Sequence, residues 1–138
     1  MYKHMQDCIF CKIIKGEIPN YRVYEDNKVL AFLDINPHAK GHTVVIPKVH
    51  AETLLDLNEE LIGPLFKGVK IVQEKLDQVL QPEGYNLGIN HGEMAGQAIP
   101  HLHIHILPRY LGDGGGNIHS IVNNPGSKSV EELFKLFK

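Results

Sequence analysis

The chain has 138 residues, of which 43% are hydrophobic and 22% charged, and its formal net charge is −2. This length is typical of one domain with its own core. The near-balance of charge excludes a broad basic surface for a nucleic-acid polymer or an anionic membrane. No apolar run approaches the roughly 20 residues that a membrane-spanning helix needs.

The first half of the chain predicts a short helix followed by three strands. Residues 8–15 are strongly apolar, with Asp7 as the expected cap and Gly16 at the end. Residues 21–25 and 28–34 predict a hairpin turning at Asp26-Asn27, and residues 42–47 predict a third strand. Residues 1–7 hold no apolar signal core, so we expect a cytoplasmic protein with reduced thiols.

The second half begins with a longer helical pattern. Its apolar residues recur every three or four positions, at Leu65, Val69, Val72, Leu76 and Val79. Asp56 with Glu59 can form a capping box, Asn58 is a competing cap, and Pro64 predicts a kink or a restart.

Two more strands and a tail complete the expected fold. A fourth strand is expected over residues 85–90 and a fifth over residues 98–107, with Pro100 near its start. Ser129 and Glu132 form a capping box for a short terminal helix. We therefore expect an α+β domain with an antiparallel sheet, spanning residues 1–138, with a core over about 8–109 and a glycine-rich loop and tail over 110–138.

The fifth strand contains a row of histidines. In residues 101–107, the alternation places Leu102, Ile104 and Ile106 toward a core, and His101, His103 and His105 on the other face. Neighbouring imidazoles are about 6.6 Å apart along a strand, so two of them can share a metal ion but three cannot. Three solvent-facing side chains are the alternative interpretation. His4, His38, His91 and His119 have no motif around them and are expected at the surface.

A neutral imidazole is a competent nucleophile near pH 7. Attack on phosphorus gives a phosphoramidate, which water cleaves once the ring is reprotonated. One difficult displacement is thereby divided into two easier ones. A row of imidazoles can supply both a nucleophile and a proton donor.

The motif His-x-His-x-His, preceded by Gly96-Gln97, resembles the signature of the histidine triad (HIT) family of nucleotide-binding hydrolases. The similarity extends from Cys8 to about Arg109 and implies the α+β fold described above. It also implies a homodimer in which two sheets join into one.

The resemblance assigns catalytic roles to four residues. His103 corresponds to the nucleophile on the α-phosphate, and His105 to a partner that contacts phosphate oxygens. His42 corresponds to a supporting histidine on the neighbouring strand, and Gln97 lies in the phosphate-side loop. Ala98 departs from the pattern, because many members have a Ser or Thr hydroxyl there for the phosphate or the leaving group.

The resemblance also implies a nucleotide site. Asp34 corresponds to the carboxylate that binds the ribose hydroxyls, although a turn residue before Asn36-Pro37 is the structural alternative. Asn90, Gln97, Ala98, His103 and His105 correspond to the phosphate side. An apolar slot for the purine corresponds to Ile9, Phe10, Ile13, Phe32 and Ile35, each of which would otherwise be an ordinary core residue.

The Cys8-x-x-Cys11 pair offers two ligands of a tetrahedral metal site. A zinc-bearing branch of the HIT family, of bacterial type, combines this pair with two histidines, which correspond to His50 and His101. Zinc would then be structural. A redox pair and two incidental buried thiols are the alternatives.

Together these features predict a hydrolase that attacks the α-phosphate of a purine nucleotide derivative and releases a nucleoside monophosphate. Phosphoramidates, aminoacyl adenylates and dinucleoside polyphosphates share this chemistry. No organic cofactor is expected. The alternatives are a binding or zinc-stapled interaction module with little catalysis, a transferase, and a hydrolase with a catalytic zinc on His101 and His103. The transferase branches have Gln in place of the third histidine, so His105 favours hydrolysis.

Overall fold

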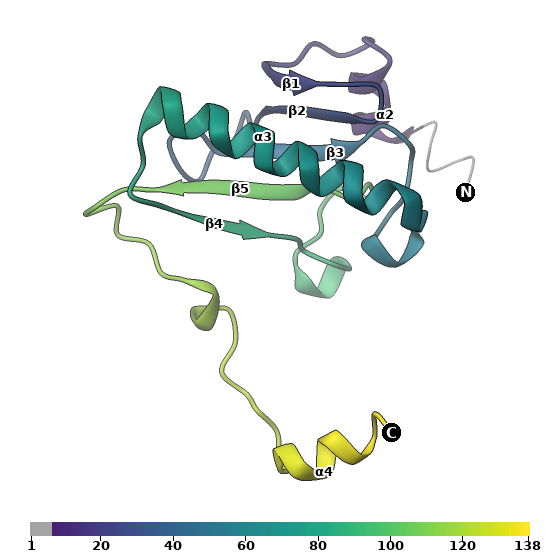
Figure 1. Ribbon diagram of the computed structural model, residues 1–138, viewed down its shortest axis with the longest axis vertical. Coiled ribbons are helices and arrows are strands. Elements are labelled where there is room, and N and C mark those ends of the chain that lie inside the picture. The colour runs from purple at the N-terminus through teal and green to yellow at the C-terminus, as the bar shows by residue number, and fades with distance from the viewer. Residues whose placement is uncertain (1–6) are drawn as a thin grey trace.

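The computed structural model describes residues 7–138 and contains a five-stranded antiparallel sheet crossed by one long helix (Figure 1). The strands are β1 (Arg22–Glu25), β2 (Val29–Leu33), β3 (Thr43–Pro47), β4 (Gly84–Gly88) and β5 (Ile104–Arg109). They lie in the order β1-β2-β3-β5-β4, and every neighbouring pair is antiparallel. The expected α+β fold is confirmed.

The long helix α3 (Ile62–Leu80) covers one face of the sheet. Leu65, Val69, Val72 and Leu76 are buried as expected, but Val79 is 78% exposed. The apolar stripe continues at Leu80 instead. Leu80 lies four residues after Leu76, and residues four apart share one face of a helix.

The helix restarts before Pro64, as predicted. The 3-10 turn η2 (Glu59–Leu61) precedes α3, so Pro64 occupies the first helical turn, where its missing N–H needs no partner. Asn58 caps η2. The expected box of Asp56 with Glu59 is wrong, because Asp56 instead pairs with Thr53 around the earlier turn η1 (Leu54–Asp56).

The short helix α2 (Ile9–Ile14) covers the other face of the sheet. Alternation along the strands assigns the two faces: Val29 and Ala31 pack in the α3 core, whereas Leu30 and Phe32 pack with α2. The cap of α2 is Cys8 rather than Asp7, because the Sγ atom of Cys8 accepts the backbone N–H of Cys11 at 3.3 Å.

The histidine-bearing strand begins later than expected. The segment over 98–103 contains Pro100, which has no N–H, and the N–H of His101 bonds to the carbonyl of Ile99 instead of a strand. His101 and His103 therefore precede β5, and only His105 lies within it. The alternation nevertheless holds, since Leu102, Ile104 and Ile106 are all buried in the α3 core.

The chain after β5 leaves the sheet. It passes through the 3-10 turn η4 (Ile118–Ser120) and ends in α4 (Val130–Lys135), which has the expected Ser129–Glu132 capping box. Figure 1 shows α4 standing away from the sheet.

None of the helices within residues 7–138 is long and apolar enough to cross a membrane. The expectations about a signal core near the start of the chain and about His4 rest on residues 1–6, which lie outside the described range.

Candidate functional site

Four side chains from three parts of the chain meet beside the end of the sheet. Cys8 and Cys11 belong to α2, His50 follows β3, and His101 precedes β5. The Nδ1 atom of His101 is 3.3 Å from the sulfur of Cys8 and 3.6 Å from that of Cys11, and the Nδ1 atom of His50 is 3.3 Å from the sulfur of Cys11. All four ligand atoms lie within 4.8 Å of one another.

This group fits a tetrahedral metal ion. Zinc bonds of about 2.0–2.3 Å place tetrahedral ligands roughly 3.3–3.8 Å apart, and two thiolates with two imidazoles are a common structural donor set. The Nε2–H of His101 donates to the carbonyl of Pro47 at 2.9 Å, which leaves Nδ1 without a proton and facing the sulfurs.

The electrostatics of the group agree with this geometry. Burial lowers the pKa of His101 to about 4, so its ring is neutral near pH 7. Burial, followed by the neighbouring Cys8, raises the pKa of Cys11 to about 11. A bound metal would therefore displace the thiol proton.

His103 lies next to this group but outside it. Its Nδ1–H donates to the carbonyl oxygen of His101 at 2.7 Å. Its Nε2 atom has no hydrogen-bond partner within residues 7–138, and the ring is 8% exposed. This tautomer leaves a lone pair on Nε2, as a nucleophile requires.

His42 and His105 form the next part of the row. The backbone N–H of His38 donates to Nδ1 of His42 at 3.1 Å, so the proton of His42 resides on Nε2. That atom lies 2.9 Å from Nδ1 of His105, which must accept, and the proton of His105 is left on Nε2. The row thus presents a bare nitrogen at His103 and an N–H at His105, whose ring centroids are 4.9 Å apart.

Burial favours the uncharged forms of His42 and His105. Burial, reinforced by His103 and His42, lowers the pKa of His105 to about 4. Burial also lowers the pKa of His42, although the nearby Asp34 carboxylate acts in the opposite direction.

Asp34 serves the turn and faces the histidines at the same time. Its Oδ1 atom accepts the backbone N–H of Asn36 at 2.8 Å, which is the turn interaction considered as the structural alternative. Its Oδ2 atom lies 3.6 Å from Nε2 of His42. One carboxylate oxygen is therefore committed to the turn and the other is directed toward the row.

The apolar candidates divide into two groups. Ile9 and Ile35 are 44% and 76% exposed, whereas Phe10, Ile13 and Phe32 are buried. Phe10 and Phe32 are in edge contact, with ring centroids 5.6 Å apart. Two of the five candidates are thus exposed, and the other three belong to the core on the α2 side of the sheet.

Gln97 uses its side chain to hold a loop together. Its Oε1 atom accepts the N–H of Gly92 at 2.8 Å, and its amide donates to the carbonyls of Glu52 at 2.6 Å and Ile99 at 3.1 Å. Both amide hydrogens are thereby engaged. Gln97 shapes the segment before the histidines, while Asn90 and Ala98 lie exposed on the same loop region.

A cavity of about 520 Å³ adjoins His42 and His105. Its lining includes Asn90, Lys40, Asn86 and residues of the C-terminal tail. Beside it, the side chain of Arg109 donates to Asp113, to Asn86 and to the carbonyl of Gly116, and so connects the glycine-rich loop to β4.

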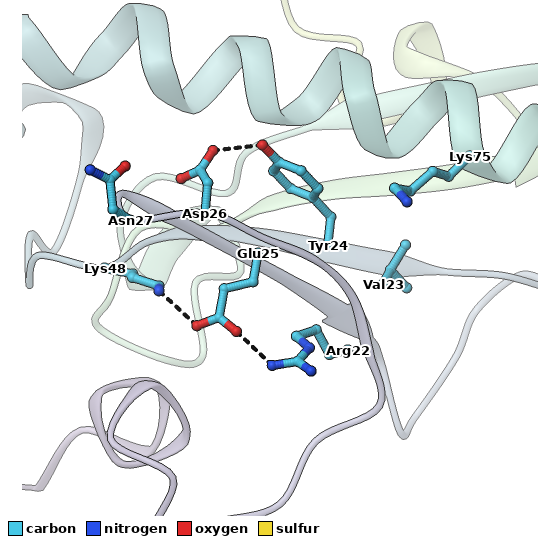
Figure 2. Close-up of a pocket in the computed structure, with 8 residues that line it drawn as sticks. All are labelled: Arg22, Val23, Tyr24, Glu25, Asp26, Asn27, Lys48 and Lys75. Carbon is cyan, nitrogen blue, oxygen red and sulfur yellow. Dashed lines mark hydrogen bonds and ion pairs between the residues drawn. The ribbon is translucent and has the colours of Figure 1, made fainter.

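A second hollow, of about 590 Å³, lies along β1, and its lining contains no histidine. Figure 2 shows the residues that line it. Glu25 pairs with both Arg22 and Lys48 at 2.7 Å, and the hydroxyl of Tyr24 donates to Asp26 at 2.7 Å. The two bonds to Glu25, from Lys48 first and then from Arg22, lower the pKa of its carboxyl. Because these charges satisfy one another, this hollow is a weak candidate for a site.

The alternative of a catalytic zinc shared by His101 and His103 finds no support in this geometry. Each of the two potential metal groups within residues 7–138 excludes His103; one holds His101 with its three partners, and the other holds Asp34, His42 and His105. In the second group, the facing nitrogens of His42 and His105 already share a proton.

Comparison with known proteins agrees with the motif. The profile of the HIT domain matches residues 15–112. The chain belongs to the HIT family. A HIT-like protein of Methanocaldococcus jannaschii is 54% identical over 107 residues, which cover 78% of this chain and 82% of the relative. The adenosine 5'-monophosphoramidase hnt1 of Schizosaccharomyces pombe is 44% identical over 102 residues, which cover 74% of each chain.

Solved structures of HIT proteins have the same fold. A HIT family protein from Bacillus anthracis superposes with a TM-score of 0.84 at 41% identity, covering 95% of this chain and 92% of that one. A zinc-bound histidine triad protein from Mycobacterium smegmatis has a TM-score of 0.75 at 34% identity, covering 88% and 85%. The Cys8–Cys11–His50–His101 group of this HIT protein fits the same kind of ion.

Sequence reasoning missed the backbone partners of the HIT histidines. The carbonyls of Pro47 and His101 and the N–H of His38 determine which nitrogen of each ring bears the proton. Because every residue type except proline supplies both groups, no residue pattern could have identified them.

Proposed function

We propose that this HIT protein is a nucleotide hydrolase that transfers a nucleoside monophosphate first to His103 and then to water. The observation that carries the proposal is the pattern of protons along the histidine row. His103 presents an unprotonated Nε2, and His105 presents an N–H beside it.

In the first step, the lone pair of His103 Nε2 forms a P–N bond to the α-phosphorus, and the bond from phosphorus to the leaving group breaks. The leaving group takes a proton as it departs. In the second step, water forms a P–O bond, the P–N bond breaks and its electron pair returns to Nε2, and the water gives up a proton. The N–H of His105 stabilises negative charge on the phosphate oxygens in both steps.

The remaining candidates would hold the nucleotide. Asp34 would accept the ribose hydroxyls through its Oδ2 atom, and the purine would lie against Ile9, Phe10, Phe32 and Ile35. Asn90, Gln97 and Ala98 would border the phosphate. Since Ala98 has no hydroxyl and the neutral ring of His105 is too weak an acid, the leaving group takes its proton from solvent.

A phosphoramidate of AMP is the proposed test substrate. The fission yeast relative is named an adenosine 5'-monophosphoramidase, and an amine is a good leaving group once it is protonated. Aminoacyl adenylates and dinucleoside polyphosphates offer the same α-phosphate to His103.

We further propose that zinc, bound by Cys8, Cys11, His50 and His101, cross-links α2 to the ends of two strands. Its chemistry there is that of a structural ion with four protein ligands. Both cysteines are free thiols, in keeping with the proposed cytoplasmic location. The proposed single domain has its core over about 8–109 and a tail over 110–138.

A homodimer is the proposed assembly. β4 is an edge strand, so two copies can pair there and extend the sheet. The tail exposes a series of large apolar side chains, which a partner copy would cover.

Substituting the nucleophile tests the activity. His103→Asn should lower kcat for an AMP phosphoramidate by at least about 10³-fold, because the P–N bond cannot form. AMP should still bind with measurable affinity, since the pocket is retained. The matched control is His119→Asn, an exposed histidine in the tail, which should keep wild-type turnover.

A trapped intermediate separates the enzyme from a binding module. Labelled substrate quenched during turnover should leave label on His103 of the wild type. Undiminished activity of the His103→Asn variant would contradict the mechanism. Nucleotide binding with no turnover in the wild type would favour the binding module instead.

A further inference from the structure

Helix α2 connects the metal group to the nucleophile. Cys8 and Cys11 face the metal group, and Phe10, which lies between them in the sequence, faces the histidine row. The ring of Phe10 contacts His103 edge-on, with centroids 5.2 Å apart and planes at 83°. It contacts His101 in the same manner, at 5.8 Å and 81°. One side chain thus packs against both a proposed metal ligand and the proposed nucleophile.

A second contact to the ring of His103, a hydrogen bond, also comes from the metal group. Its Nδ1–H donates to the carbonyl oxygen of His101 at 2.7 Å, and the ring of His101 is held between the thiols and the carbonyl of Pro47. Movement of His101 would therefore displace the atom that keeps the proton of His103 on Nδ1.

Helix α2 is too short to hold this arrangement by itself. It has six residues, and isolated helices below about 12 residues are marginal in water. Its N-terminal end is held by Cys8, which caps the helix and belongs to the metal group, and by the burial of Phe10 and Cys11. Loss of the metal would release the end of the helix that contacts His103.

We propose that the Cys8–Cys11–His50–His101 group positions the nucleophile, with Phe10 and the carbonyl of His101 as the two links to the ring of His103. Phe10 is then a positioning residue as well as part of the proposed purine slot. Metal occupancy sets the fraction of molecules in which Nε2 of His103 faces the phosphate. This inference rests on the proposed function for its kinetic consequence, but the ring orientation can be measured without turnover.

The two roles of Phe10 have different kinetic signatures. A residue that only lines the purine slot changes KM, because it contributes equally to the ground state and the transition state. A residue that positions the nucleophile changes kcat.

The test compares Phe10→Leu with Ile14→Ala in the zinc-loaded protein. Ile14 is a partly buried residue of the same helix and packs against the same cluster, but it has no role in the proposed site. Phe10→Leu should lower kcat for the AMP phosphoramidate about tenfold. Ile14→Ala should leave kcat within about twofold, although it also loosens the helix.

The second measurement needs no activity. Imidazole nitrogen NMR of the substrate-free protein should show His103 protonated on Nδ1 in the wild type and in Ile14→Ala. It should show a mixture of tautomers in zinc-loaded Phe10→Leu and in wild-type protein after zinc chelation. Chelation should still lower kcat in Phe10→Leu, because the carbonyl of His101 remains as the second link, but the combined loss should be smaller than the product of the two separate losses.

The proposal is overturned if Phe10→Leu changes KM alone and leaves both kcat and the tautomer of His103 as in the wild type. It is also overturned if the losses of kcat caused by zinc removal and by Phe10→Leu simply multiply when the two changes are combined. Where chelation unfolds the chain, the zinc-loaded Phe10→Leu protein decides the question. If the wild type shows no turnover, the proposed function fails, while the NMR comparison still tests the link.

Discussion

At His105, burial and hydrogen bonding act on one ring. The ordinary pKa of histidine, about 6.5, would leave the ring partly charged in weak acid. Burial, with His103 and His42 beside it, lowers this pKa to about 4, so the neutral ring persists well below pH 6. The neutral form is also the form that the row requires, because Nδ1 must accept the proton of His42 at 2.9 Å.

This environment predicts an unusual acid limit for the ring of His105. The ring should become protonated only as the pH falls below about 5 and approaches 4, and its protonation should break the bond from His42 to Nδ1. The measurement is a titration of the substrate-free protein followed by imidazole nitrogen NMR. In His105→Gln, this transition should be absent from the spectra. A midpoint at pH 6–7 for the signals of His105 would show that the ring titrates as an ordinary exposed histidine.

The sequence indicated which histidines and cysteines to consider as a candidate site, but it did not indicate which partner each histidine ring would have. Alternation placed three histidines on one face, and the spacing of the two cysteines indicated a metal. Which histidine faces the thiols, and which nitrogen remains bare, depends on backbone groups such as the carbonyl of His101. The amide of Gln97 likewise turns toward three backbone groups.

At the scale of elements, a glycine allows α3 to pack closely against the sheet. A Cβ atom on Gly68 would lie 2.9 Å from a methyl carbon of Val29, a core residue of β2 that is 1% exposed. Neither the helix nor the buried strand can yield without disturbing the core. The absence of a side chain at Gly68 therefore sets the distance between the helix and the sheet.

Gly68→Ala should consequently destabilise the protein, although alanine normally improves a helix. Overpacking costs about 1–3 kcal/mol and the gain in helix propensity returns about 1 kcal/mol, so we expect the free energy of unfolding to fall by up to about 2 kcal/mol. Urea unfolding at fixed protein concentration measures the change. The control Lys67→Ala alters the adjacent exposed position and should remain within about 0.5 kcal/mol of wild type. A more stable Gly68→Ala variant would mean that the helix can move away from β2 at little cost.

Periodicity predicted the elements better than their ends. The strands and the long helix follow from alternation and from the three- to four-residue step. The start of β5 does not, because Pro100 and a local bond between His101 and Ile99 divert the backbone before pairing begins. The capping box at Thr53 was overlooked for a similar reason: Asp56 had two possible partners, each three residues away, and the turn geometry selected the one on its N-terminal side.

At the scale of the whole molecule, the apolar side chains over residues 130–137 belong to neither of the two core clusters within residues 7–138. They include Val130, Leu136 and Phe137, which are 83%, 68% and 86% exposed. Exposed apolar groups of this size on a projecting helix are typical of an interface. A second copy is the proposed partner, because β4 offers an open sheet edge on the same chain.

Shortening the aromatic side chains of α4 and the residues after it tests this assembly. Phe134→Ser combined with Phe137→Ser should weaken the dimer at least about tenfold. Two aromatic rings of about 150–250 Å² each contribute roughly 25 cal/mol for every Å² that the dimer removes from water. Only the area that is exposed in the single chain counts toward this gain. Sedimentation of the wild type over a range of concentrations gives the reference dissociation constant. Lys128→Ser, an exposed polar change in the same tail, should leave that constant unaltered. A wild-type monomer at tens of micromolar, or a double variant that dimerises equally well, would assign the apolar tail to some other contact.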